Sequence, residues 1–162
     1  MADGTELTHV GADGSARMVD VSAKAVTQRI ATAQAVLSTT PEVMRLLVAG
    51  ELPKGEALAV ARVAGILGAK QTSSLIPLCH PLPISSAKVD FEPAESSVRI
   101  VATVKTTGVT GVEMEALTAA SVAALTLYDM IKAVDRGAVI GELLVVAKSG
   151  GASGEWSREV PA

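Results

Sequence analysis

The chain has 162 residues, of which 49% are hydrophobic and only 2% aromatic, and it carries a formal net charge of −3 with a pI near 5.4. This acidic balance excludes a broad basic surface for nucleic acid or anionic membrane, and the length fits one domain with a substantial core. The mean hydropathy of +0.41 leaves more apolar surface than one small core needs, so we expect a homo-oligomer.

Targeting signals are not evident. The first residues lack a basic segment followed by an apolar one, and the uncharged run at residues 116–128 is shorter than the ~20 residues of a membrane span. One cysteine allows no internal disulfide. We therefore expect a cytoplasmic protein with neither a membrane nor a nucleic-acid partner.

The first half of the chain is expected to be mostly helical after a short non-helical start. Residues 1–16, rich in Gly, Asp and Thr, predict a flexible arm, and residues 18–21 a short strand. Ser22 is a suitable N-cap for a helix to about residue 37, because Val26, Ile30, Ala33 and Leu37 recur at helical spacing.

A second helix is bracketed by Thr40 as N-cap, Pro41 at its first position and Gly50 just past its end. A third helix opens at Lys54-Gly55-Glu56 and ends near Lys70. Its candidate buried positions are Leu58, Ala61, Val63, Ile66 and Ala69.

The second half alternates differently. Residues 85–91 and 97–106 predict an antiparallel hairpin, residues 112 to about 134 a long helix, and residues 139–147 a final strand. Residues 148–162 form a Gly-rich C-terminal tail with Trp156, which we assign to the same domain as residues 17–147. This order predicts an α+β fold, an antiparallel sheet packed by helices in a single domain.

A proline-stiffened loop at residues 75–83 carries Cys79 and His80. Its three prolines restrict the backbone and favour extended geometry at the residues before them. The loop could hold a reactive pair, or simply a buried cysteine beside a hydrogen-bonded histidine. Metal ligation is less favoured, because no paired Cys or His spacing of the structural zinc kind is present.

The long helix carries further candidates. Asp129 and Lys132 are three residues apart and share one face, as an ordinary surface ion pair or as an acid/base pair at a cleft. Glu113 and Glu115 suit the helix N-terminus, but they diverge by about 200° on a regular helix, so one shared site requires a non-helical first turn or a second subunit.

Two glycine-rich segments could meet an anion. Gly108-Val109-Thr110-Gly111 precedes the long helix, although its spacing is not that of a Walker loop. Lys148-Ser149-Gly150-Gly151 joins a cation to a flexible backbone, which suits phosphate and equally a solvated tail.

Together these segments resemble the cyclic pyranopterin monophosphate synthase family, the molybdenum cofactor biosynthesis protein C proteins, nearly from end to end. The segments that carry the resemblance are Leu7-Thr8-His9, Met18-Val19-Asp20-Val21-Ser22, Lys54-Gly55, Ala61-Arg62-Val63-Ala64-Gly65-Ile66, Ile76-Pro77-Leu78-Cys79-His80-Pro81-Leu82, Thr110-Gly111-Val112-Glu113-Met114-Glu115-Ala116-Leu117-Thr118-Ala119-Ala120-Ser121, Tyr128-Asp129-Met130 and Lys148-Ser149-Gly150-Gly151.

The resemblance implies a lyase that converts a 3′,8-cyclised dihydro-GTP, made by an upstream radical GTP cyclase, into cyclic pyranopterin monophosphate with release of diphosphate. Such a reaction needs acid/base groups beside cations that bind the triphosphate. The family also implies a ferredoxin-like subunit in a homohexamer built from dimers, with sites at subunit boundaries. No cofactor is required by the sequence, although Mg²⁺ could accompany the triphosphate.

The resemblance also implies residue roles. Asp129 would be the catalytic acid/base with Lys132 as its partner, and Lys54 and His80 would be further catalytic groups. The substrate would be contacted by Leu78, Cys79, His80, Glu113, Met114, Glu115 and Lys148.

One departure concerns the tail, where Ala152 stands in place of a lysine found in many relatives, so tail contacts to phosphate are open; the tail could instead close over the site as a lid. The alternative function is a non-catalytic oligomer that binds a nucleotide or a metal as a regulatory module.

Overall fold

The computed structural model describes residue 10 and residues 13–158, so most of the expected N-terminal arm and the motif Leu7-Thr8-His9 lie outside the described residues. The elements follow one another along the chain as β1 (Thr27–Ser38), α1 (Pro41–Ala49), α2 (Ala57–Lys70), α3 (Thr72–Leu75), β2 (Ile84–Pro93), β3 (Ser97–Gly108), α4 (Glu113–Ile131), β4 (Val139–Ser149) and β5 (Trp156–Ser157).

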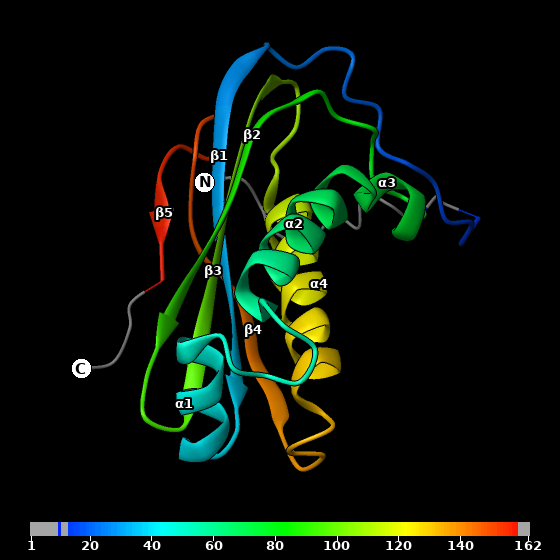
Figure 1. Cartoon of the computed structure of the whole chain (residues 1–162). Helices are drawn as coiled ribbons and strands as arrows, with labels where there is room; N and C mark the ends of the chain where they lie inside the picture. Colours follow the sequence, from blue (N-terminus) through cyan, green and yellow to red (C-terminus); the bar gives the residue numbers. More distant parts are fainter. Residues whose placement is uncertain (1–9, 11–12, 159–162) are drawn as a thin grey trace.

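The strands form one antiparallel sheet in the order β2-β3-β1-β4-β5, and α2 and α4 lie side by side against one of its faces (Figure 1). Without β5, the order along the chain is the β-α-β-β-α-β order of ferredoxin-like folds. The expected α+β class and the antiparallel sheet packed by helices are therefore confirmed.

The predicted helix over residues 22–37 is wrong, because this segment holds β1, the central strand of the sheet. Ala31, Ala33, Ala35 and Leu37 alternate along β1 and are fully buried. Positions 33 and 37 fit a helical period as well as a strand period, so the apolar spacing alone did not separate the two. The pairing of β1 with both β3 and β4 decides in favour of the strand.

The segment before β1 also differs from the prediction. Residues 18–21 form no strand, and Ser22 caps no helix. Instead, the Ser22 backbone N–H donates to Asp20 Oδ1 at 2.9 Å, and the Lys24 N–H donates to the Val21 carbonyl at 3.0 Å. These hydrogen bonds make a compact turn that satisfies the backbone locally, without a ladder partner.

The short helix α1 has the predicted ends. Thr40 accepts a hydrogen bond from the Val43 N–H at 3.3 Å, and Pro41 is the first helical residue. Gly50 ends the helix with φ of 70°, a left-handed conformation that favours glycine.

The predicted buried face of α2 is partly wrong. Ala61 and Ala69 are buried as expected and Leu58 and Ile66 are partly buried, but Val63 is 58% exposed. The buried face instead contains Gly65 and Gly68, which are in close contact with α4. A Cβ on Gly65 would lie 2.9 Å from the Ala119 carbonyl oxygen, and one on Gly68 would lie 2.8 Å from Val122 Cγ2. The small residues let the two helices approach closely, which leaves the larger Val63 on the outside.

The second half of the chain matches its prediction closely: the hairpin, the long helix and the final strand appear as β2, β3, α4 and β4. Among the described helices, α4 alone is long and apolar enough to cross a membrane, but it is the central helix of the core, with Ala116, Ala120, Ala124 and Leu127 fully buried.

Candidate active site

The proline-stiffened loop at residues 75–83 and the first turn of α4 meet at a cavity of about 350 Å³. One wall is the proline-stiffened loop and another is the start of α4, while residues before β1 close a third side. The lining residues are Val19, Val21, Lys24, Leu78, Cys79, His80, Leu82, Thr110, Gly111, Glu113, Met114 and Glu115.

The proline-stiffened loop is fixed at both ends. Ile76 is extended, with φ of −111° and ψ of 106°, as the prolines predicted. The Cys79 N–H donates to the Ile76 carbonyl at 3.0 Å, and Thr106 of β3 donates its hydroxyl to the Pro83 carbonyl at 2.7 Å. These contacts hold Cys79 and His80 against the cavity on a restrained backbone.

The environment of Cys79 opposes a thiolate. Burial raises the pKa of the Cys79 thiol, and the negative charge of Glu115 raises it further. A nucleophilic or metal-binding cysteine instead needs a lowered pKa. The structure therefore favours Cys79 as a neutral part of the cavity wall.

Glu113 and Glu115 line the same cavity from one chain, although α4 is helical from Glu113 onward, so the expectation that a shared site requires a non-helical first turn or a second subunit is wrong. Glu113 is the first residue of α4, and its carboxylate folds back over Gly111, where a Cβ would overlap it. Glu115 is 4% exposed, and burial raises the pKa of its carboxyl group, with a smaller rise from the charge of Glu113. The cavity thus contains one carboxylate paired with a lysine and one buried carboxyl group whose pKa is raised.

Lys148, near the end of β4, joins the site through Glu113. Its Nζ lies 2.9 Å from Glu113 Oε1. Lys148 and Glu113 also border a second cavity of about 510 Å³, which extends over Ser153, Glu155 and Trp156. The tail returns to the sheet there, because Trp156 in β5 pairs with Lys148 in register.

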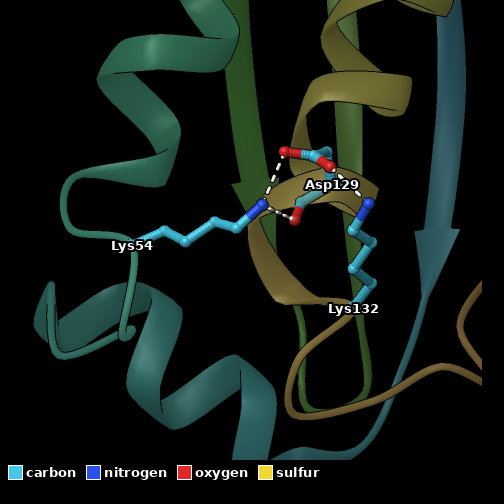
Figure 2. Close-up of polar contacts among 3 residues, drawn as sticks. All are labelled: Lys54, Asp129 and Lys132. Carbon is cyan, nitrogen blue, oxygen red and sulfur yellow. Dashed lines mark hydrogen bonds and ion pairs between the residues drawn. The ribbon is translucent and has the colours of Figure 1, made fainter.

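A second cluster lies at the other end of α4 (Figure 2). Asp129 Oδ2 is 2.7 Å from Lys54 Nζ, and Asp129 Oδ1 is 2.7 Å from Lys132 Nζ. Lys54 comes from the loop before α2, and it also donates to the main-chain oxygen of Asp129 at 2.8 Å. Hydrogen bonds from Lys132 and Lys54 lower the pKa of Asp129 to about 2, and the carboxylate raises the pKa of Lys132.

The two groups of residues are separated within the chain. Glu113 and Asp129 lie 16 positions apart on one helix, which corresponds to about 24 Å at 1.5 Å per residue. The structure therefore brings the cavity residues and Lys148 together, and separately Lys54, Asp129 and Lys132, but it does not join the two groups within one chain.

Sequence reasoning missed Lys24 and Asp20. Lys24 lines the cavity, and Asp20 has a lowered pKa, mainly from its hydrogen bonds with Ser22 and to a smaller extent from the charge of His80. Both lie in the turn that was predicted as a strand followed by a helix. The signal available in the sequence was the position of these two charged residues beside the short apolar run at residues 18–21.

Comparison with known proteins agrees with these motifs. The model of the MoaC family matches residues 18–151. The chain belongs to the MoaC family.

Among its MoaC relatives is the cyclic pyranopterin monophosphate synthase of Corynebacterium efficiens, 63% identical over 153 residues, which cover 94% of this chain and 99% of the relative. The enzyme of the same name from Herpetosiphon aurantiacus is 61% identical over 93% of each chain. That of Streptomyces avermitilis is 60% identical over 94% of this chain and 89% of the relative. The expected family is therefore confirmed.

Proposed function

We propose that this chain is a lyase of molybdenum cofactor biosynthesis that converts 3′,8-cyclo-7,8-dihydroguanosine 5′-triphosphate into cyclic pyranopterin monophosphate and diphosphate. The observation that carries the proposal is the identity of about 60% to cyclic pyranopterin monophosphate synthases over nearly the whole chain. The substrate is formed by an upstream radical GTP cyclase, and both steps take place in the cytoplasm.

The chemistry of the cavity supports this reaction. Cyclic phosphate formation expels diphosphate, so cations must offset charge on the phosphate chain while acid/base groups move protons on the ring system. His80 and Glu115 offer proton-transfer groups in one cavity, and Lys148 lies at the border with the second cavity. We assign the ring system to the first cavity and the phosphates to the side of Lys148.

The second cluster supplies the remaining charge. Because the pKa of Asp129 is about 2, its carboxylate is ionised at neutral pH and keeps two ammonium groups beside it. We propose that Lys54 and Lys132 act on the substrate while Asp129 holds them in place and accepts a proton once substrate displaces a lysine.

A complete site needs both clusters, and a distance of about 24 Å along α4 is too long for one small substrate to bridge. We propose that the cavity of one protomer faces the Lys54, Asp129 and Lys132 cluster of a second, in a homohexamer of dimers. The outer face of α2 supports burial against another copy, because Val60, Val63 and Leu67 are each about half exposed there.

A resident metal ion would need a set of converging ligands. No three His, Cys, Asp or Glu side chains among the described residues converge as a ligand set. We propose that any Mg²⁺ enters with the triphosphate, whose oxygens suit a hard cation.

The direct test measures diphosphate release by the purified protein. We expect release from the cyclised dihydro-GTP and none from GTP. Binding of the cyclised nucleotide without diphosphate release would overturn the lyase proposal and favour a non-catalytic nucleotide-binding module.

A subunit-mixing experiment tests the shared site. Asp129→Asn damages one cluster and His80→Ala the other, so random mixed oligomers should regain activity in about a quarter of their sites. The matched control mixes Asp129→Asn with Lys132→Met, two changes in the same cluster, and should regain none. No recovery in the first mixture would contradict a site built from two chains.

A further inference from the structure

Arg29 on β1 contacts the loop that leads into α4. Its Nε donates to the Gly108 carbonyl at 3.3 Å, and its Nη2 donates to the Val109 carbonyl at 3.2 Å. Two adjacent carbonyls are thus bound by one planar guanidinium group. The loop continues through Thr110 and Gly111, which line the cavity.

The same guanidinium contacts the tail on its other side. A Cβ on Gly151 would overlap Arg29 Nη1, and Gly151 has φ of 73°. Gly150 is equally constrained, since a Cβ added there would overlap the Gln28 carbonyl oxygen, and its φ is 96°. The turn after Lys148 is therefore in direct contact with β1 at Arg29, at positions where only glycine fits without a shift.

Arg29 consequently joins two segments that end in the same ion pair. The loop at residues 108–111 leads to Glu113, the turn at residues 149–151 follows Lys148, and these two side chains pair at 2.9 Å. Arg29 is partly buried, and within the described part of the chain its guanidinium makes no ion pair with a carboxylate. Its polar contacts are therefore with backbone.

We propose that Arg29 is a positioning residue, which fixes the distance between Glu113 and Lys148 by binding the two backbone segments that carry them. The role depends on the shape of the guanidinium, because its three nitrogens meet Gly108, Val109 and Gly151 separately, whereas the single nitrogen of a lysine cannot reach all three. The kinetic part of the proposal rests on the proposed function, whereas the structural part does not.

Hydrogen exchange of the free protein tests the structural part without any turnover. In Arg29→Lys we expect amides at residues 109–112 and 149–153 to exchange at least about tenfold faster, with the rest of the sheet unchanged. Arg99→Lys is the matched control, because Arg99, which lies on the neighbouring strand β3, also donates hydrogen bonds to two partners, Gln34 and Glu92. Unchanged exchange in both segments of Arg29→Lys would overturn the proposal.

Steady-state kinetics separate positioning from charge. We expect Arg29→Lys to lower kcat/KM for the cyclised substrate by about 100-fold, nearly as much as Arg29→Ala. Near-wild-type kcat/KM in Arg29→Lys would show that the positive charge suffices and would overturn the proposal. An inactive wild-type protein would instead contradict the proposed function and leave the exchange test valid.

The contact can also be broken from the tail. Gly151→Ala retains Arg29 but displaces its guanidinium, so it should reproduce the faster exchange at residues 109–112. Gly154→Ala is the matched control, because Gly154 has a similar φ of 66° but open space where the Cβ would lie. Equal effects of Gly151→Ala and Gly154→Ala on exchange at residues 109–112 would show that backbone strain alone explains the faster exchange, and would overturn the proposal.

Discussion

Lys54 Nζ lies 2.7 Å from the Asp129 carboxylate and 2.8 Å from the Asp129 main-chain oxygen, although the two residues are 75 positions apart. One lysine thereby binds both the side chain and the end of α4 that carries it. The pair is exposed, since its side chains retain 40% and 54% of their accessible surface. Exposed ion pairs contribute little to the free energy of unfolding, so removing this pair should not unfold the protein.

The first prediction concerns this cluster. Lys54→Ala, Asp129→Ala and Lys132→Ala should each lower diphosphate release by at least about 100-fold, because a group that transfers protons or offsets charge is lost. The melting temperature and the oligomer mass should stay close to wild type. Arg45→Ala, which breaks an exposed pair with Glu51 of similar length, should leave turnover unchanged. Loss of assembly in all three cluster variants would instead indicate a structural role.

Glu115 gives a pH-dependent prediction. Its pKa is raised in the fold, so its ionisation costs stability as the pH rises from the ordinary glutamate pKa through the folded pKa. Glu115→Gln should therefore raise the melting temperature relative to wild type at pH 8, with a gain that shrinks as the pH falls below the ordinary glutamate pKa, where wild-type Glu115 becomes protonated in both states. A gain of equal size at both pH values would contradict this explanation.

Cys79 should be a slow nucleophile. Because burial and the charge of Glu115 raise the pKa of the thiol, iodoacetamide should alkylate Cys79 more slowly at pH 7.5 than it alkylates free cysteine. Glu115→Gln removes part of that effect and should accelerate the reaction, as mass spectrometry can follow. Glu95→Gln, at the turn between β2 and β3, is the control and should not. Fast alkylation of the wild type would reopen the reactive-cysteine hypothesis.

His80 and Cys79 should differ in their effect on turnover. His80→Ala removes a hydrogen-bonding or proton-transfer group from the cavity and should lower kcat/KM by about 100-fold. Cys79→Ser changes a neutral wall residue into another of similar size and should cost less than about tenfold. A larger loss in Cys79→Ser than in His80→Ala would reverse the assignment of roles in this loop.

The contact between α2 and α4 predicts a stability effect at Gly65. An added Cβ would lie 2.9 Å from the Ala119 carbonyl, so the helices must separate, and overpacking should outweigh the helix propensity gained from alanine. We expect Gly65→Ala to lower the free energy of unfolding in urea by about 1 kcal/mol. Gly141→Ala, where the Cβ meets nothing within 4 Å, should not be destabilising. Equal stability of the two variants would show that the helices adjust freely.

Local signals in the sequence predicted much of the molecule. Caps and prolines defined α1 and the loop around His80, since these depend on a few neighbouring residues. The pairing of Asp129 with Lys132 followed from their spacing of three on one helix. The segment at β1 failed, because its apolar positions satisfied two periods and only the neighbouring strands could choose between them.

The family and the chemical groups of the proposed site could be predicted without the structure, because motifs of adjacent residues carry both. The tertiary structure alone decided where those groups lie. It buried Glu115 while leaving Glu113 to pair with Lys148, and it brought Lys54 to Asp129. It also set the cavity and the second cluster at opposite ends of α4, since long-range packing rather than local spacing fixes such distances.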